Sequence, residues 1–331
     1  MIVQQVIDDI SVIEREASAL GIKPYLVGGL VRDLLNNQLD DTPDIDLVIE
    51  SELSPFKENL ALALNGKLQR ETSFITTKIV LNKSNNAGLQ EIDIARARTE
   101  TYKRGGALPE VAPASIKDDL RRRDFTINAM ALPLSTFKSW LLGDRENYKS
   151  EVIDFFSGKE DLSNRLIRVL HPNSFIDDPT SIFRAFRYLV RNDGSLEKET
   201  ESLISLGVKK EIFRTISKFR LIKEIKKICL EKGALRIIKL LNSYQVLPLL
   251  KLFNKDKTQY VFSALEKVNF NGSENAFKSF MSCCYAFATP EQRVSYVKDF
   301  SLGKSFVIEC AKSHEMVMSQ NLMNDVENEN V

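Results

Sequence analysis

One short segment near the N-terminus constrains the fold of this chain more than any other part. Leu26 and Val27 are apolar, Gly28 and Gly29 follow them, and Asp44-Ile45-Asp46-Leu47 comes after a short amphipathic stretch. This order predicts a strand, a tight turn, a helix start and a second strand. Because side chains alternate across a strand, Asp44 and Asp46 share one face, while Ile45 and Leu47 point into the core.

Two carboxylates on one face of a strand indicate a cation site. Neighbouring carboxylates repel each other unless a cation lies between them, and Mg²⁺ accepts such oxygens together with water and phosphate oxygens. Gly28 and Gly29 let the backbone approach an anion closely, and their amides precede a helix start. We therefore predict that Asp44 and Asp46 are catalytic and hold two Mg²⁺ ions beside a nucleoside triphosphate. A solvated Asp-x-Asp pair on an edge strand is the alternative.

A third carboxylate lies on a later predicted strand. Asp93 alternates with Ile92 and Ile94, so it faces away from the core. It completes the metal site or is a surface residue, and the sequence leaves both open.

Composition excludes several classes of protein. The chain has 331 residues, 43% hydrophobic and 27% charged, with a net charge of +1, as in a globular protein of two or more domains. Its four cysteines form no C-x-x-C motif and it has two histidines, which argues against a disulfide framework and a zinc site.

The N-terminus lacks the basic region of a signal peptide and no apolar run reaches about 18 residues. We expect a cytoplasmic protein without a membrane partner.

The hydrophobic pattern changes character along the chain. Helices are predicted over 3–20 and 55–65, strands over 25–27, 44–49, 74–81 and 90–95 with a polar turn at 82–88, and a short pair of strands near 152–155 and 167–170. From about residue 174 the pattern is helical, and the acidic tail 324–331 is expected to fray. This order predicts an α+β domain followed by an all-helical remainder.

Basic residues cluster in the middle of the chain. The stretch 96–109 is basic and rich in glycine, as in loops that close over a substrate. A helix is expected over 119–130, and its three consecutive arginines, 121–123, cannot share one helix face. Some should reach phosphate while another pairs internally with Asp118 or Asp124. Phe125, Ile127 and Met130 are expected in the core.

These motifs together resemble a known family. Gly28-Gly29-x-x-Arg32-Asp33, Asp44-x-Asp46, the loop Thr99-Glu-Thr-Tyr102 and Arg122-Arg123-Asp124-Phe125-Thr126-x-Asn128-Ala129 are similar to motifs of class II tRNA nucleotidyltransferases. These are the bacterial-type CCA-adding enzymes, and bacterial poly(A) polymerases are their relatives. The resemblance covers residues from about 24 to about 225.

The resemblance implies a fold and a domain order. A polymerase-β-like nucleotidyltransferase head would span 1–140, neck and nucleobase-recognition helices 141–225, and a tRNA-binding body and tail 226–331. It also implies a reaction, in which an RNA 3′-hydroxyl attacks the α-phosphate of CTP or ATP and pyrophosphate leaves. The residues that would bind the nucleotide are Gly28, Gly29, Arg32, Asp33, Arg122, Arg123, Asp124, Asn128, Asp178, Arg184 and Arg187.

The chain departs from the family pattern at two positions. Class II enzymes carry Glu-Asp-x-x-Arg where this chain has Asp177-Asp178-Pro-Thr-Ser181, and the family uses the Asp and Arg to recognise the incoming base. Ser181 cannot replace the paired donors of an arginine, so Arg184, one turn later, is a candidate substitute. From the pattern alone, the two aspartates could also cap the helix. Phe219 replaces a glutamate of the family's Ser-x-Glu-Arg motif, a change that concerns packing.

A basic stretch in the second half indicates a polyanion partner. Residues 209–239 hold eleven Lys or Arg against three Glu, a net charge of +8. A solvated helix face is the plain alternative. By the resemblance, the phosphates of a tRNA acceptor end would bind there. The predicted RNA-binding residues are Lys209, Lys210, Lys218, Lys223, Lys226 and Lys227.

The leading hypothesis is a template-independent enzyme that extends tRNA 3′ ends. Addition of CCA, of A alone or of CC alone all stay open, although the retained loop 99–109 argues against CC alone, since the resemblance links this loop to A addition. A poly(A) polymerase is the nearest alternative. A catalytically impaired RNA-binding relative is the alternative from another class, motivated by Ser181 and Phe219. The sequence does not identify a protein partner and leaves the oligomeric state open.

Overall fold

The computed structural model describes residues 2–39, 44–82, 88–270, 274–298 and 302–312. The predicted fraying tail and most of the predicted turn at 82–88 lie outside these residues. The chain forms two compact units. The first unit contains residues 1–103 and 108–172, and the second contains 104–107 and 173–331. The predicted domain boundaries at residues 140 and 225 stay predictions.

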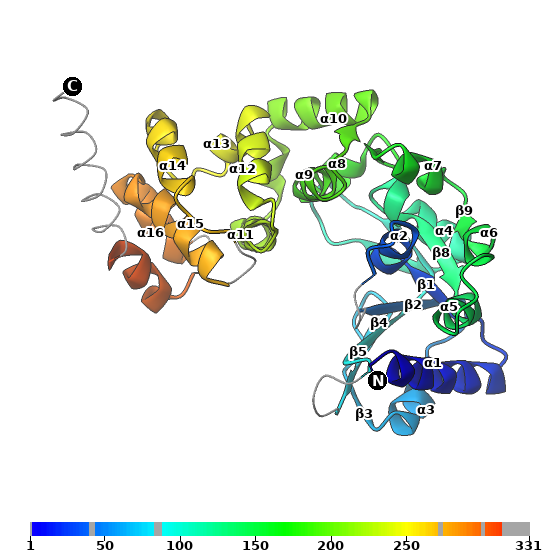
Figure 1. The fold of residues 1–331 in the computed structure, drawn as a ribbon. Coiled ribbons are helices and arrows are strands. Elements are labelled where there is room, and N and C mark those ends of the chain that lie inside the picture. The colour runs from blue at the N-terminus through cyan, green and yellow to red at the C-terminus, as the bar shows by residue number, and fades with distance from the viewer. Residues whose placement is uncertain (1, 40–43, 83–87, 271–273, 299–301, 313–331) are drawn as a thin grey trace. The chain divides into compact units, whose positions relative to one another are not determined.

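The first unit combines a mixed sheet with short helices (Figure 1). Its strands are β1 (Tyr25–Val27), β2 (Ile45–Ile49), β3 (Gly66–Leu68), β4 (Thr76–Leu81), β5 (Glu91–Arg96), β6 (Arg98–Thr101), β7 (Glu110–Pro113), β8 (Met130–Pro133), β9 (Ile153–Asp154) and β10 (Leu166–Ile167). Its helices are α1 (Ile2–Ala19), α2 (Gly29–Leu35), α3 (Phe56–Ala63), α4 (Ile116–Arg121), the 3-10 turn η2 (Thr126–Asn128), α5 (Leu134–Leu141), α6 (Tyr148–Glu151) and α7 (Gly158–Ser163).

A seven-stranded sheet with the order β3-β4-β5-β2-β1-β8-β9 organises the first unit. The central pair β2 and β5 is parallel, and its register places Asp46 opposite Asp93. The neighbouring pairs in this sheet are antiparallel. Strands β6 and β7 form a separate hairpin. The predicted α+β class is confirmed.

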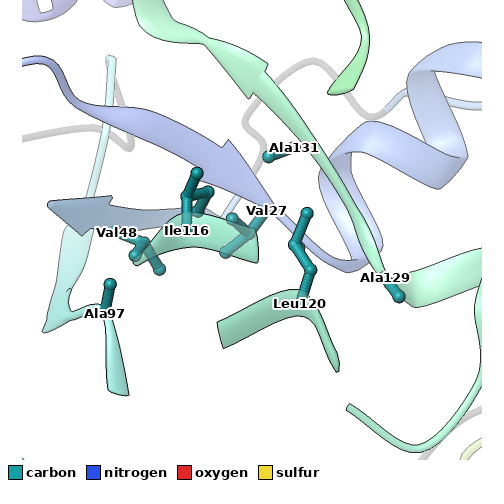
Figure 2. Packing of buried hydrophobic residues seen from close by; sticks show 7 residues of the cluster. All are labelled: Val27, Val48, Ala97, Ile116, Leu120, Ala129 and Ala131. Carbon is teal, nitrogen blue, oxygen red and sulfur yellow. The ribbon is translucent and has the colours of Figure 1, made fainter. Parts of the chain in front are cut away.

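The two faces of the sheet are covered differently. Ile45, Leu47 and Ile49 are buried on one face of β2, and helix α1 packs against both α3 and α5. On the other face, Val48 belongs to a buried cluster with Ile116 and Leu120 of α4, together with Val27, Ala97, Ala129 and Ala131 (Figure 2). Helix α4 therefore covers the Val48 part of the face that also carries Asp46.

The second unit is helical. Its helices are α8 (Ser174–Asp177), α9 (Ser181–Arg191), α10 (Lys198–Lys209), η3 (Ile212–Thr215), α11 (Lys218–Cys229), α12 (Ala234–Ser243), α13 (Val246–Leu249), η4 (Lys255–Lys257), α14 (Thr258–Leu265), α15 (Glu274–Ala286) and α16 (Pro290–Lys298), with a short strand β11 (Ser195–Leu196). Helix α9 buries Ile182, Phe183 and Phe186 and packs against α11 and α12. No helix among the described residues has the length and apolarity that a bilayer crossing requires.

The structure corrects the predicted end of the strand-rich region. The sequence pattern predicted a helix over 119–130, but α4 ends at Arg121, and β8 at Met130–Pro133 joins the central sheet. The predicted core residues Phe125, Ile127 and Met130 are buried, as expected. A short, continuously apolar run does not distinguish a buried strand from a helix, which explains the error. The hairpin β6–β7 was also missed, and β9 pairs with β8 rather than with the segment near 167–170.

The structure also breaks the helix predicted at 174–191. Asp178 separates α8 from α9 and is extended, with φ −132° and ψ 91°. Pro179 causes the break, because a residue that precedes proline is pushed out of the helical region. Asp177 and Ser181 therefore lie in two different helices.

Candidate active site

The two carboxylates at the centre of the first unit lie on adjacent parallel strands. Asp46 of β2 is paired in register with Asp93 of β5, so both side chains leave the same face of the sheet. Asp44 precedes β2, two residues from Asp46 and on the same face. Lys78 of β4 forms an ion pair with Asp93 at 3.2 Å. The structure therefore brings Asp93 to the predicted site.

A cavity of about 250 Å³ opens over these carboxylates. Asp46 and Asp93 line one side, and Arg98, Arg122 and Arg123 also line it. Arginine side chains bind the oxygens of phosphates through several donors at once. A cavity with acidic groups beside arginines suits an anion that arrives with a cation.

The local electrostatics disfavour an ionised Asp46 in the absence of a cation. The Asp46 side chain keeps access to solvent, but it lines the cavity and is partly surrounded by protein. This burial, followed by repulsion from Asp93, raises the pKa of Asp46, and Arg123 offsets part of the effect. A bound cation would remove this repulsion.

The donor set fits the Mg²⁺ that the sequence predicts. No three His, Cys, Asp or Glu side chains form a ready-made metal cage within the described part of the chain. Mg²⁺ does not need such a cage, because it binds through one or two carboxylates and takes its other ligands from water and substrate phosphates. Asp46 and Asp93 supply two carboxylates on one face, with Asp44 next to them. The assignment of these three residues as metal ligands stays a prediction.

The glycine turn lies next to Arg123. Gly28 has φ +72°, a backbone conformation that glycine adopts without strain. A Cβ atom at this position would lie 3.1 Å from Nη1 of Arg123. Glycine at residue 28 therefore allows the positive φ of the turn and leaves room for the close approach of this guanidinium.

Arg32 and Asn128 are buried and joined by a hydrogen bond. Arg32 is 3% exposed and donates hydrogen bonds of 2.9 Å to both carboxylate oxygens of Asp33. It also donates a 2.8 Å hydrogen bond to Oδ1 of Asn128, which links α2 to η2. The burial of Arg32 and Asn128 favours a supporting role over direct contact with a nucleotide.

A buried carboxylate organises the arginines that follow α4. Asp119 is fully buried and accepts hydrogen bonds from Arg122 at 2.7 and 3.0 Å and from Arg123 at 3.0 Å. Arg122 donates a further hydrogen bond of 2.7 Å to Glu100 of β6. The predicted internal partners were Asp118 and Asp124. Asp118 instead accepts from the Ser115 hydroxyl at the start of α4, and Asp124 accepts from the Phe125 amide.

The second unit contains a polar cluster around Asp178. This carboxylate accepts hydrogen bonds from the Thr180 hydroxyl at 2.6 Å, Arg220 at 2.9 Å and Arg184 at 3.2 Å. Burial opposes ionisation, but Arg184, Thr180 and Arg220 outweigh it and lower the pKa of Asp178. Ser181 is buried and accepts a 2.8 Å hydrogen bond from Arg184. Arg184 thus contacts Ser181, the residue that stands where the family pattern has an arginine, and its role as a substitute stays a prediction.

The tip of the 98–113 hairpin belongs to this second unit. The Gly106 amide donates a 3.0 Å hydrogen bond to the Asp177 carbonyl. Arg220 donates to the Gly106 carbonyl at 3.1 Å as well as to Asp178. Residues 104–107 are therefore held against α8 and α11, and the predicted loop 99–109 is in part regular hairpin, with β6 ending at Thr101.

Other predicted residues lie away from these clusters. Arg187 forms an ion pair with Glu231 at 2.8 Å, which favours a role in packing α9. The six predicted RNA-binding lysines lie at the end of α10, just after it and along α11: Lys209, Lys210, Lys218, Lys223, Lys226 and Lys227. Lys223 stacks over the ring of Phe219, 45% exposed, and Lys227 pairs with Glu224. These assignments stay predictions.

Three residues were not assigned from the sequence. Arg98 lines the cavity, Asp119 holds two arginines, and Arg220 joins residue 106 to Asp178. A charged residue inside an apolar helical pattern, as at Asp119, is the signal that could have identified one of them.

Comparisons with known proteins agree with this geometry. Residues 24–168 match the model of the poly(A) polymerase head domain. The solved structure of a CCA-adding enzyme from Thermotoga maritima, complexed with tRNA-CCA, is 30% identical with a TM-score of 0.71, over 96% of this chain and 72% of that one. The chain belongs to the family of tRNA nucleotidyltransferases and poly(A) polymerases.

The similar proteins of this nucleotidyltransferase family are mostly longer. The A-adding tRNA nucleotidyltransferase of Aquifex aeolicus is 38% identical over 226 residues, which are 68% of this chain and 25% of that protein. The A-adding tRNA nucleotidyltransferase of Halalkalibacterium halodurans is 38% identical over 218 residues, 65% of this chain and 47% of that protein. The chain thus spans a quarter to about a half of the length of these two relatives.

Proposed function

We propose that this chain adds CMP or AMP from CTP or ATP to the 3′ end of tRNA without a nucleic-acid template. The observation that carries the proposal is the cavity of the first unit, in which Asp46 and Asp93 lie beside Arg98, Arg122 and Arg123. A nucleoside triphosphate bound with Mg²⁺ needs both kinds of group at once. Relatives described as A-adding enzymes, and solved relatives that hold ATP or CTP, support this choice.

The chain's own residues would have distinct roles in the reaction. Asp44, Asp46 and Asp93 would hold Mg²⁺, which when bound favours ionisation of a hydroxyl and neutralises triphosphate charge. Arg123 and the Gly28 turn would orient the triphosphate. The RNA 3′-oxygen would form a bond to the α-phosphorus, the bond from that phosphorus to the β-bridging oxygen would break, and pyrophosphate would leave.

Recognition of the base would fall to the second unit. The carboxylate of Asp178 and the guanidinium of Arg184 offer an acceptor and paired donors, the groups needed to read the edge of a cytosine or an adenine. Because Ser181 is buried and bonded to Arg184, an arginine introduced at 181 would displace Arg184. Arg184→Met is therefore the sharper variant, and Arg191→Met, an exposed arginine of the same helix, is its control.

An extension assay tests the proposal. The chain is incubated with Mg²⁺, labelled ATP or CTP, and tRNA that ends at the discriminator base, at C or at CC. One A added to the CC end without C addition indicates an A-adding enzyme, and C additions indicate a CC- or CCA-adding enzyme. Long A tracts on unrelated RNA would indicate a poly(A) polymerase, and no incorporation on any substrate would contradict the proposal and favour an RNA-binding relative.

Variants separate catalysis from binding. Asp46→Asn should abolish incorporation while tRNA binding largely survives, and Asp8→Asn on the exposed face of α1 should match the wild type. Arg184→Met should change the preference between CTP and ATP, whereas Arg191→Met should not. Near-normal turnover of Asp46→Asn would contradict the assigned site.

A further inference from the structure

Asp119 is a buried carboxylate that does not line the cavity. Its side chain is 0% exposed, and it accepts hydrogen bonds from Arg122, Arg123 and the backbone amide of Arg98. Burial disfavours the charged form, but Arg123 and Arg122 outweigh it and lower the pKa of Asp119. A buried charge is tolerated in a fold only when it is paired in this way.

Arg122 and Arg123, which both bind Asp119, differ in how many of their guanidinium donors form hydrogen bonds within the protein. Arg122 is held on both sides, by two bonds to Asp119 and one to Glu100, itself bound by Arg98. Arg123 is held by Asp119 through Nη2 alone, at 3.0 Å. Its Nε is buried without a hydrogen-bond partner in the part of the chain that the structure describes. Arg123 therefore retains hydrogen-bonding capacity that the protein does not use, and its Nη1 lies beside the Gly28 turn, whereas Arg122 is engaged by the protein.

The hydrogen bond to Asp119 determines the position of the Arg123 guanidinium. Its Nη1 lies next to the Gly28 turn, and its charge acts on Asp46 strongly enough to offset part of the rise in the Asp46 pKa. Without Asp119, the guanidinium would be free to turn toward the carboxylates of the cavity. There it would compete with the cation that the nucleotide brings.

We propose that Asp119 is a positioning residue that fixes the guanidinium of Arg123 between the Gly28 turn and Asp46, ready to receive the triphosphate. This inference rests on the proposed function. A donor that is already ordered loses little entropy when the ligand binds, and misplacement by about 1 Å can lower the rate of an enzyme a hundredfold. Asp119 acts through Arg123 and makes no contact of its own with substrate.

A double-mutant cycle on the full chain tests the inference. The probe is ATP with Mg²⁺ and without RNA, so that binding is measured in the absence of turnover. Asp119→Asn preserves the shape of the side chain and should weaken ATP binding by about tenfold, as should Arg123→Lys. The double variant should lose about tenfold rather than about a hundredfold, because Asp119 acts only through Arg123.

Control variants separate positioning from folding. Asp118→Asn makes the same chemical change on the neighbouring residue of α4, whose carboxylate accepts a hydrogen bond from the Ser115 hydroxyl, and it should bind ATP like the wild type. If Asp119→Asn fails to fold, Asp119→Glu keeps the charge and moves the carboxylate by about one methylene, and it should still weaken ATP binding.

The outcomes separate the two proposals. Wild-type affinity in Asp119→Asn or Asp119→Glu, or additive losses in the cycle, would refute the role of Asp119 while leaving the proposed function intact. Failure of the wild-type chain to bind ATP would overturn the proposed function, and the role of Asp119 with it.

Discussion

Replacing Gly106 with alanine should release the hairpin tip from the second unit. Gly106 has φ +73°, and a Cβ at this residue would lie 2.5 Å from the Thr215 hydroxyl oxygen and 2.9 Å from the Thr215 carbonyl oxygen. Backbone atoms cannot yield in the way that the end of a long side chain can. Gly106→Ala is therefore incompatible with the position that residues 104–107 occupy.

The free-energy cost of Gly106→Ala can be compared with the free energy of the hydrogen bonds that hold residues 104–107. A left-handed backbone costs a non-glycine residue about 1–2 kcal/mol, and the steric overlap adds about 1–3 kcal/mol. Two hydrogen bonds hold Gly106, from its amide to Asp177 and from Arg220 to its carbonyl, and each contributes about 1 kcal/mol. Because the cost exceeds the roughly 2 kcal/mol of holding energy, the tip should detach while the fold persists.

Limited proteolysis measures this detachment. Lys103 and Arg104 are trypsin sites beside the tip, and a loss of about 2 kcal/mol should raise cleavage there about 30-fold when opening is fast. The free energy of global unfolding should change little. Gly21→Ala is the matched control, since Gly21 has φ +65° but no neighbouring atom within 4 Å of its Cβ position, and cleavage at 103–104 should stay at the wild-type rate.

Either of two results would refute this reasoning. Cleavage of Gly106→Ala at the wild-type rate would mean that the tip is not held by these contacts. A loss of several kcal/mol in global stability would mean that the tip is an integral part of the second unit's core.

Three further predictions concern charged residues. Because the folded-state pKa of Asp46 is raised, its charge opposes folding above that pKa and has no effect below the ordinary value of 3.8. Asp46→Asn should therefore stabilise the metal-free protein at neutral pH, by less than about 1 kcal/mol because solvent screens an exposed carboxylate, and this advantage should disappear in denaturant titrations at acidic pH. Arg220→Met removes the bonds to Gly106 and Asp178 and should speed trypsin cleavage at 103–104 by about fivefold; an unchanged rate would exclude this anchor. Asp161→Ala removes the carboxylate that accepts hydrogen bonds from the buried Thr126 hydroxyl and from Arg168. It should lower the free energy of unfolding by about 2 kcal/mol, as measured by urea denaturation. A loss below about 0.5 kcal/mol would contradict this prediction.

Local sequence patterns predicted a helix or strand correctly where one of its faces is buried and the other is exposed. Alternation along Ile45-Asp46-Leu47 correctly placed the isoleucine and leucine in the core and the carboxylate outside it. Helical spacing correctly predicted α1 and the helical character of the second unit. These features depend on the period of one segment alone, so neighbouring residues determine them.

Patterns failed where both faces are buried or where distant segments meet. Strand β8 is apolar on both sides, and nothing local in Met130-Ala-Leu132 distinguishes it from a helix. Pro179 indicates a break in the helix at Asp178. The sequence near Asp178 does not indicate its contact with Arg220, because Arg220 lies 42 residues away.

The amino-acid sequence by itself determined the α+β class, the family motifs and the carboxylates of β2, because each depends on residue types at short spacing. Only the tertiary structure decided that Asp93 stands opposite Asp46, that Asp119 rather than Asp118 or Asp124 holds the arginines, and that Arg184 reaches the hydroxyl of Ser181. Strand register and side-chain pairing arise from packing between segments far apart in the chain, and the order of residues in any one segment does not encode them.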